Sequence, residues 1–345
     1  MIDLPLRRRA HLVEDLPTQV YIEVTNRCNS TCVSCPLTYD HFLPHEPKRH
    51  LSWADFRRIV DGFPRLDRVV LHGIGEPLLN KDLPRFVDHL KGRGAEVLFN
   101  TNAILLDQKR GDALAAAGLD QIRVSIDAVT PDLYARLRGV DALPQIIRNL
   151  RAFVDRHGGR TQPRVSLWWV TMQANLPQLP EFVRLAADIG ISEIYMQRLV
   201  YFGGGETLGE NTTMKAEQSL HATLEQEQAR QISQCEVLAA TLGLAFRASG
   251  ATTPSESIST MGPHPWQGCM RPWILMYISA NGTALPCCVS PFATDDYARI
   301  MLGNVLIEPL RDVWNGGPYR ALRSAVLSDA PAPWPCQYCG VKWSL

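Results

Sequence analysis

The stretch VYIEVTNRCNSTCVSC, residues 20–35, joins a strand-like apolar run to three cysteines at CxxxCxxC spacing. Cys28, Cys32 and Cys35 place three thiolates in one loop. Iron–sulfur clusters are held by cysteine thiolates, usually four per cluster. A loop with three therefore predicts a cluster in which one iron has no protein ligand, and a small molecule can bind and react at that iron.

The overall composition gives no sign of a nucleic-acid or membrane partner. The chain has 345 residues, and its 35 basic residues balance its 35 acidic residues to a formal net charge of zero. A neutral chain has no electrostatic reason to bind nucleic acid or an anionic membrane surface. No apolar run reaches the ~18 residues of a spanning helix, and the first residues lack the apolar core of a signal peptide. We expect a cytoplasmic protein.

Strand-like and helical patterns alternate from residue 18 to about residue 200, which is typical of a parallel α/β sheet. The six expected strands are Gln19–Thr25, Arg68–His72, Glu96–Asn100, Gln121–Ile126, Arg164–Thr171 and Glu193–Leu199. Six βα units are too few for a closed eightfold barrel. The pattern predicts an open, partial (β/α)6 TIM-like barrel whose ligands bind at the carboxyl ends of the strands.

The rest of the chain divides around this barrel. We expect an N-terminal extension at 1–17, the barrel at 18–205, a long helix followed by a linker at 206–262, and a small module at 263–345. The module has little periodic structure but four spaced cysteines, Cys269, Cys287, Cys336 and Cys339. So small a segment needs a metal to fold, and four thiolates make a closed metal site.

Zinc is the alternative metal for both cysteine groups, because structural zinc is also held by clustered cysteines. In the first group His41, His45 or His50 could supply a fourth ligand. The chain would then be a zinc-binding interaction protein. Cys235 and Cys288 belong to neither group, and core packing explains a buried cysteine without a metal.

A glycine-rich turn, HGIGEP at residues 72–77, ends the second expected strand. Its glycines let the backbone approach a ligand closely, and Glu76 adds an acceptor. Together with the cysteine loop, this turn resembles the signature of radical S-adenosylmethionine (SAM) enzymes. The resemblance implies that the three loop cysteines hold a 4Fe-4S cluster and that Gly73, Gly75, Glu76 and Pro77 bind SAM.

Further positions fit the same family less tightly. The resemblance implies that Asn102, Ser125 and Arg138 hold the ribose and carboxylate of SAM. The family places an aromatic residue just before the third cysteine, but this chain has Ser34. The adenine contact is therefore expected elsewhere, with Gln197 as a candidate.

The C-terminal module resembles the SPASM modules that carry auxiliary clusters in this family. Its four cysteines match the shorter "twitch" form, which holds one cluster and occurs in dehydrogenases that act on aminocyclitols. The resemblance implies two 4Fe-4S clusters and SAM as cofactors. It also implies an external electron donor such as a flavodoxin or a ferredoxin.

This family cleaves SAM reductively to a 5′-deoxyadenosyl radical, which removes a hydrogen atom from the substrate. We expect dehydrogenation of a small polar natural-product intermediate, such as a sugar, an aminocyclitol or a nucleoside, with the auxiliary cluster as electron acceptor. Epimerisation and decarboxylation are alternatives. Modification of a ribosomal peptide ranks lower, because only about 17 residues, too few for a leader-binding domain, precede the first strand.

Alternation along the strands predicts which side chains reach the substrate. Polar faces place Glu23, Arg123, Trp169 and Tyr195 inside the barrel as substrate contacts. No residue is assigned a catalytic role from the sequence.

Overall fold

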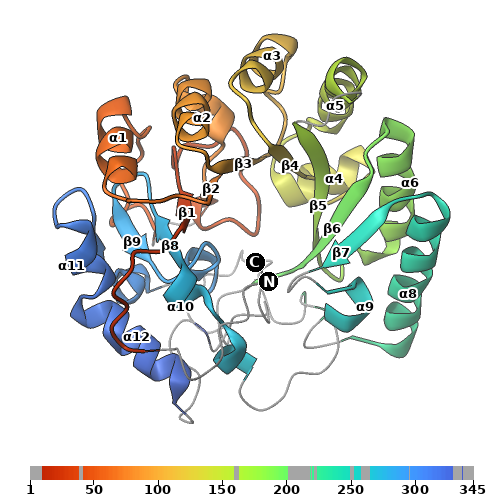
Figure 1. Ribbon diagram of the computed structural model, residues 1–345. Helices are drawn as coiled ribbons and strands as arrows, with labels where there is room; N and C mark the ends of the chain where they lie inside the picture. The colour runs from red at the N-terminus through yellow and green to blue at the C-terminus, as the bar shows by residue number, and fades with distance from the viewer. Residues whose placement is uncertain are drawn as a thin grey trace.

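One twisted sheet organises the computed structural model (Figure 1). The structure describes residues 10–38, 42–158, 163–200, 218, 220, 224–248, 252–257, 265–294, 296–328 and 336. The strand order is β10-β9-β8-β1-β2-β3-β4-β5-β6-β7. From β8 to β7 every neighbouring pair is parallel, and β9 and β10 are antiparallel additions at one edge.

The six expected strands are all present, and the α/β fold class with its partial barrel is confirmed. They are β1 (Gln19–Ile22), β2 (Arg68–Leu71), β3 (Glu96–Thr101), β4 (Gln121–Ser125), β5 (Arg164–Thr171) and β6 (Glu193–Arg198). The sheet also contains strands that the sequence did not predict. They are β7 (Ala245–Ala248), β8 (Leu275–Ile278), β9 (Thr283–Leu285) and β10 (Gly303–Asn304).

Helices cover the outer face of the curved sheet (Figure 1). The α-helices of the described residues are α1 (Trp53–Asp61), α2 (Leu83–Gly92), α3 (Gln108–Ala116), α4 (Pro131–Arg138), α5 (Leu143–His157), α6 (Leu179–Ile189), α8 (Gln226–Thr241), α9 (Pro254–Ser257), α10 (Arg271–Ile274), α11 (Leu310–Trp314) and α12 (Gly317–Leu327). The main apolar core lies between sheet and helices, where Phe56, Phe86 and Trp169 are fully buried. Ser52 caps α1 by accepting a hydrogen bond from the amide of Asp55.

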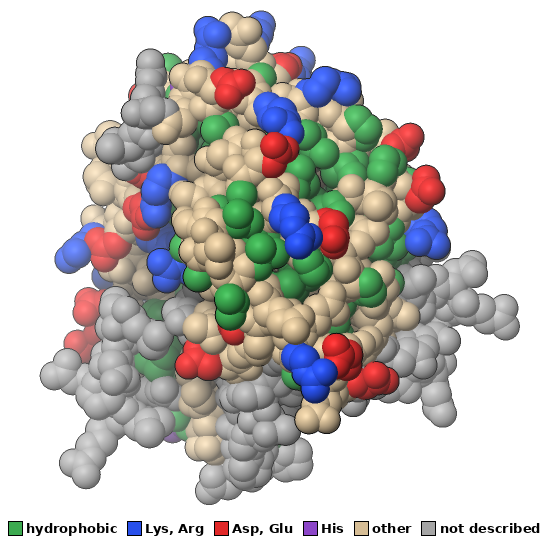
Figure 2. Space-filling view, turned by 90° about the vertical axis from the view of Figure 1, so that its right-hand side faces the viewer, with side chains coloured by type: hydrophobic (Ala, Val, Ile, Leu, Met, Phe, Trp, Pro, Cys, Tyr) green, Lys and Arg blue, Asp and Glu red, His purple; other side chains and the backbone are tan. Residues whose placement is uncertain are grey.

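Within the segment 206–262, expected as a long helix followed by a linker, the described residues contain α8 from Gln226 to Thr241. Residues 213–217, 219 and 221–223 lie outside the described residues. The side of the molecule formed by α6 and α8 carries hydrophobic side chains mixed with charged ones (Figure 2). Within the described ranges, we find no helix with the length and apolar character needed to cross a bilayer.

The C-terminal module continues the barrel sheet, since β8 pairs in parallel with β1 on the side opposite β2, in the register Gln19 to Leu275. The N-terminal segment packs on the same module: Asn315 bonds the backbone of Val13, and the Trp314 indole donates to the carbonyl of Asp15. Segments far apart in sequence thus share one surface. The four domain boundaries given above stay a prediction.

Candidate active-site cavity

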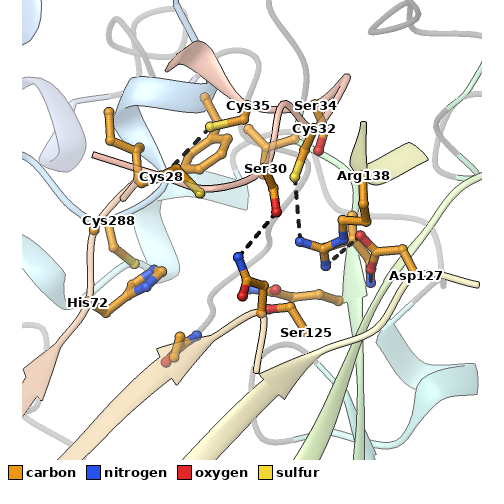
Figure 3. A pocket seen from close by; sticks show the side chains of 18 of the residues that line it. Cys28, Ser30, Cys32, Ser34, Cys35, His72, Ser125, Asp127, Arg138 and Cys288 are labelled. Carbon is orange, nitrogen blue, oxygen red and sulfur yellow. Dashed lines mark hydrogen bonds and ion pairs between the residues drawn. The ribbon is translucent and has the colours of Figure 1, made fainter. Parts of the chain in front are cut away.

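A cavity that is partly open to solvent lies where the parallel strands end (Figure 3). The loop after β1 brings Cys28, Cys32 and Cys35 to its wall, and each of the three is partly buried. The sulfur of Cys35 lies 3.8 Å from the carbonyl oxygen of Ile74 in the glycine-rich turn. The structure therefore brings together the two motifs that the sequence singled out.

Both glycines of the turn are required by close backbone approach. A Cβ atom at Gly73 would overlap the side chain of Glu23, and one at Gly75 would overlap the carbonyl oxygens of Thr25 and Arg27. The turn is thus pressed against β1 and the start of the cysteine loop. Only glycine fits at either position without moving the chain.

Glu23 binds this turn through its carboxyl group. One carboxylate oxygen accepts a hydrogen bond from the amide of Ile74 at 2.8 Å, and the other accepts from the amide of Ala280 at 3.0 Å. The side chain is buried, and desolvation raises its pKa to about 8. Glu23 is therefore a structural link and not the substrate contact that we expected from strand alternation.

Glu76 ties the turn to the end of β3. It accepts hydrogen bonds from the hydroxyl of Thr101 and the amide of Asn102, both at 2.7 Å, and from the amide of Leu78 at 3.0 Å. Its burial raises the pKa of the carboxyl group. Pro77 begins the short 3-10 helix that follows, Pro77–Leu79.

Asn102 joins the cysteine loop to β3. Its amide nitrogen donates to the side chains of Asn29 at 2.7 Å and Ser30 at 3.2 Å, and the second contact is drawn in Figure 3. Ser125 at the end of β4 and Gln197 on β6 also line the cavity. The residues expected around SAM, except Pro77, therefore line one cavity.

Arg138 forms a buried ion pair with Asp127 at 2.6 Å, and its guanidinium lies 3.8 Å from the sulfur of Cys32. Asp127 also accepts a hydrogen bond from the amide of Val170 at 2.9 Å. The negative charges of Asp127 and Cys32 raise the pKa of Arg138, although burial opposes them. Asp127 was not predicted as a site residue, and its place after β4 is the signal that could have found it.

The cavity residues fit a 4Fe-4S cluster with SAM. In the described part of the chain, no three potential ligands are grouped tightly enough to hold a single metal ion. A cluster instead spreads its thiolates over separate irons. Two polar atoms at the wall, Oδ1 of Asn100 and Nε of Arg138, are buried without a hydrogen-bond partner among the described residues. A ligand with hydroxyl and carboxylate groups, as SAM has, would supply partners for both.

Apolar side chains also form part of the cavity wall. They are Ile74, Val170, Leu199, Val200, Val289 and Phe292, and Val170 adjoins Asp127. Ile74, Val200 and Val289 belong to one buried cluster, against which Phe292 packs. Val289, Phe292 and the buried Cys288 follow β9, so the C-terminal module supplies part of this wall.

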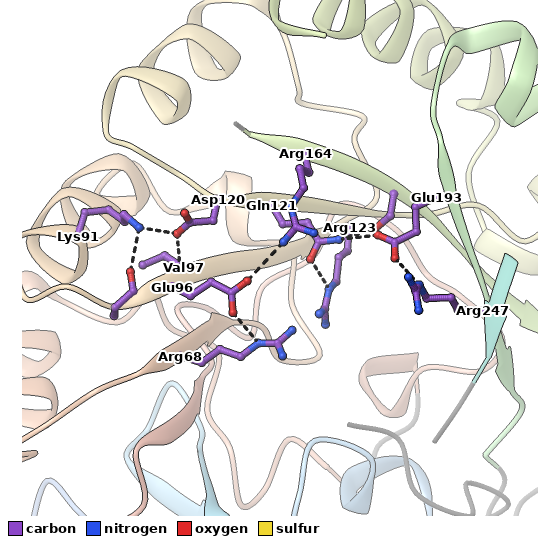
Figure 4. Close-up of polar contacts among 12 residues, drawn as sticks. Arg68, Lys91, Glu96, Val97, Asp120, Gln121, Arg123, Arg164, Glu193 and Arg247 are labelled. Atoms are coloured by element: carbon purple, nitrogen blue, oxygen red, sulfur yellow. Dashed lines mark hydrogen bonds and ion pairs between the residues drawn. The ribbon is translucent and has the colours of Figure 1, made fainter. Parts of the chain in front are cut away.

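Arg123 and Tyr195 point inside the barrel as predicted but lie in a stack beneath the cavity. The guanidinium of Arg123 lies 4.6 Å from the ring centre of Trp168, and Trp168 stacks on Tyr195 at 3.9 Å. Arg123 also contacts Gln121, which belongs to a band of charged and polar groups across the strands (Figure 4). Arg123 and Tyr195, both expected to contact the substrate, therefore contact other side chains of the protein.

The orientation predicted for Trp169 is wrong. Trp169 is fully buried in the outer core and packs on Phe182 of α6 with ring centres 4.6 Å apart. Its neighbour Trp168 faces the barrel interior instead, on the same side of β5 as Ser166 and Val170. Ser166, whose hydroxyl accepts a hydrogen bond from the Trp168 indole, marks the interior face of β5.

The auxiliary cysteines lie in the C-terminal module. Cys269, Cys287 and Cys336 are partly buried. The thiolates of Cys269 and Cys287 both contribute to raising the pKa of buried Arg271, so they lie in electrostatic range of one guanidinium. Cys339 lies outside the described residues, as does His41 of the zinc alternative. The ligand roles of all seven cysteines stay predictions.

Comparisons with known proteins agree with both motif regions. Residues 22–167 match the model of the radical SAM superfamily, and residues 269–340 match that of the SPASM iron–sulfur cluster-binding domain. A PqqA peptide cyclase of Xanthomonas campestris is 26% identical over 87% of this chain and 74% of its own length. A probable GTP 3′,8-cyclase of Saccharolobus solfataricus is 31% identical over 54% of this chain. That match covers only 58% of the cyclase.

Among solved structures, SuiB of Streptococcus suis bound to the precursor peptide SuiA superposes with a TM-score of 0.69 at 18% identity. The superposition covers 98% of this chain and 72% of SuiB. At this identity the likeness concerns the fold alone. It extends through both matched regions, so the arrangement of barrel and C-terminal module is shared.

Proposed function

Because the chain carries a radical SAM domain followed by a SPASM domain, we propose that it oxidises an apolar side chain of a peptide substrate. The radical SAM domain binds a 4Fe-4S cluster and SAM, and the SPASM domain binds auxiliary iron–sulfur clusters. When bound, the first cluster and SAM supply a 5′-deoxyadenosyl radical that removes a hydrogen atom from the substrate. The protein holds the substrate and excludes water.

The proposal assigns each group of residues a task. Cys28, Cys32 and Cys35 hold the first cluster. The turn from Gly73 to Pro77 lies along SAM, whose polar groups face Asn102, Ser125, Arg138 and Gln197. Cys269, Cys287, Cys336 and Cys339 hold the auxiliary cluster.

The apolar side chains that line the cavity favour an apolar substrate group. A sugar or aminocyclitol presents hydroxyl groups on every face, and burying these against Val200, Val289 and Phe292 would leave them without hydrogen bonds. The polar side chains expected to bind such a molecule are engaged elsewhere: Glu23 with two backbone amides and Arg123 in its stack. An aliphatic or aromatic side chain fits this wall.

The PqqA peptide cyclase supports the same substrate class, because its match extends over 87% of this chain and includes both domains. SuiB, which shares the fold, was solved with a bound precursor peptide. Dehydrogenation of a small polar metabolite stays a prediction without a specific contact in the cavity to favour it.

Oxidation, as opposed to return of a hydrogen atom, is supported by where the C-terminal module meets the cavity. Cys288 lines the cavity, and the preceding residue, Cys287, is a proposed ligand of the auxiliary cluster. A redox centre so close to the substrate is suited to accept its second electron.

The test uses the full chain, reconstituted anaerobically with iron, sulfide, SAM and dithionite. The probe is a library of synthetic peptides, each with one perdeuterated valine, leucine or phenylalanine. We expect deuterium in 5′-deoxyadenosine and a peptide that has lost one deuterium atom together with one further hydrogen or deuterium atom. Deuterium arriving only from perdeuterated glucose or glucosamine, offered in a parallel reaction, would reject the peptide proposal.

A further inference from the structure

His72 directly follows β2 and lines the cavity beside the glycine-rich turn. In Figure 3 its imidazole lies beside Cys288, on the side of the cavity away from Arg138 and Asp127. Tyr21 and the imidazole form a T-shaped ring contact, with ring centres 6.3 Å apart. The imidazole is thus held at the wall where the barrel and the C-terminal module meet.

The other titratable side chains lining the cavity have tasks or charges that exclude them as bases. The three loop cysteines are proposed cluster ligands. Glu76 accepts three hydrogen bonds from protein groups, and Asp127 is paired with Arg138. Arg198 is a cation, and Cys288 directly follows the proposed cluster ligand Cys287. The histidine is what remains among the described residues of the wall.

The surroundings of His72 keep its imidazole uncharged. Burial lowers the pKa of the ring to about 4, and the guanidinium groups of Arg123 and Arg271 act in the same direction. The ring therefore has a lone pair ready to accept a proton throughout the neutral pH range. A weak base suffices here, because a substrate that is losing an electron becomes strongly acidic.

We propose that His72 is the catalytic residue that accepts the proton released when the substrate is oxidised, an assignment that rests on the proposed function. The first substrate hydrogen leaves as an atom and forms 5′-deoxyadenosine. The substrate would then lose one electron, which the cluster held by the cysteines of the C-terminal module would accept when bound, and one proton, from a neighbouring N–H, O–H or C–H bond, to an imidazole nitrogen. Two bonds to hydrogen are broken, one double bond or cross-link forms, and an imidazolium results.

Cys288 supports this assignment by its position. It lies beside His72 in Figure 3 and follows Cys287, a proposed ligand of the auxiliary cluster. Proton and electron would then leave the substrate at the same wall. Loss of the proton together with the electron leaves the substrate without a net charge in a cavity with an apolar lining.

The test compares His72→Gln with His89→Gln in the reconstituted full chain, using the perdeuterated peptide library. His89 lies on α2, outside the barrel, with Nε2 3.3 Å from Asp61. We expect His72→Gln to keep its iron, bind SAM and transfer deuterium to 5′-deoxyadenosine within about twofold of wild type. Oxidised product should fall about 100-fold, the usual size of a general-base effect. His89→Gln should behave as wild type.

Electron paramagnetic resonance of freeze-quenched samples gives a readout independent of turnover. In His72→Gln a carbon-centred substrate radical should accumulate, and added imidazole should restore product in His72→Ala. Unchanged product formation in His72→Gln would overturn the assignment. So would an equal loss of deuterium transfer and product, which would show a structural role in the turn.

Two further outcomes are distinguishable. Solvent deuterium in the product, lost in Cys288→Ala, would overturn the role of His72, because return of a hydrogen atom needs no base. If wild type oxidises glucosamine and none of the peptides, the proposed function fails. The same comparison of variants on that sugar would then still decide the role of His72.

Discussion

Glu23, directly after β1, accepts a hydrogen bond at 3.0 Å from the backbone amide of Ala280, which lies just beyond β8 in the C-terminal module. Its second oxygen accepts from Ile74 in the glycine-rich turn. One buried carboxyl group thus fixes the C-terminal module and the proposed SAM-binding turn relative to each other. This arrangement is possible because β8 pairs with β1 directly.

The raised pKa of Glu23, about 8 in the folded chain against an ordinary 4.5, makes stability depend on pH. Between these values the folded state keeps a proton that the unfolded state has released, so the free energy of unfolding falls as pH rises. The slope is about 1.4 kcal/mol per pH unit at most. We expect urea midpoints to drop between about pH 6 and pH 8, and Glu23→Gln to flatten this dependence.

The control for this prediction is Glu227→Gln, on the exposed surface of α8. It should retain the wild-type slope. A Glu23→Gln variant whose midpoints fall as steeply as those of the control would show that other groups cause the dependence.

Gly75→Ala should damage the cavity, because a methyl group there meets the backbone carbonyls of Thr25 and Arg27. Overpacking against backbone costs about 1–3 kcal/mol and displaces the turn. We expect SAM binding, measured by equilibrium dialysis with the reconstituted chain, to weaken by tenfold or more. Gly92→Ala is the matched control, since nothing lies within 4 Å of its new methyl group in α2. Equal SAM affinity in both variants would contradict the assigned role of the turn.

Asp127→Asn should leave Arg138 as a buried cation without its counter-charge. Breaking a buried pair by removing one partner typically costs about 3–5 kcal/mol. We expect a clear fall in the urea midpoint. The exposed pair Arg230 and Glu227 is the comparison, and Glu227→Gln should change the midpoint by less than the error of the measurement. A small effect of Asp127→Asn would mean that solvent reaches the pair.

The sequence predicted the parts of this site that are local in the chain. The spacing of Cys28, Cys32 and Cys35 and the glycines of the turn carry their chemistry within a few residues. The six predicted strands were predictable because each is an apolar run bounded by turn residues. β7 and β8 are no shorter than β1 and β2, but they lie after the alternating βα pattern, in segments expected to be linker and C-terminal module, so their pairing with β6 and β1 was not foreseen.

What the sequence could not predict depends on those missed pairings. Glu23 looked like an inward polar residue, but its partner Ala280 reaches it only because β8 lies beside β1. The surroundings of His72 could not be predicted either, because Cys288, which lies beside it, and the buried Arg271, which lowers its pKa, are distant in the sequence. Which of Trp168 and Trp169 faces the barrel interior could not be predicted, because two adjacent tryptophans on one strand give no polar contrast between the two faces of the sheet.

Iron content separates the two cysteine groups and decides the zinc alternative. Two 4Fe-4S clusters require about eight irons per chain, and each group is proposed to hold one cluster. Replacing Cys28, Cys32 and Cys35 together by alanine should leave about four irons and abolish 5′-deoxyadenosine formation, because SAM loses its cluster. Cys269→Ala with Cys287→Ala should also lower the iron content to about four, yet retain SAM cleavage. Cys235→Ala, on the buried face of α8, is the control and should keep the full iron content. A colourless wild-type protein that contains zinc and no sulfide after anaerobic purification would remove the radical mechanism altogether.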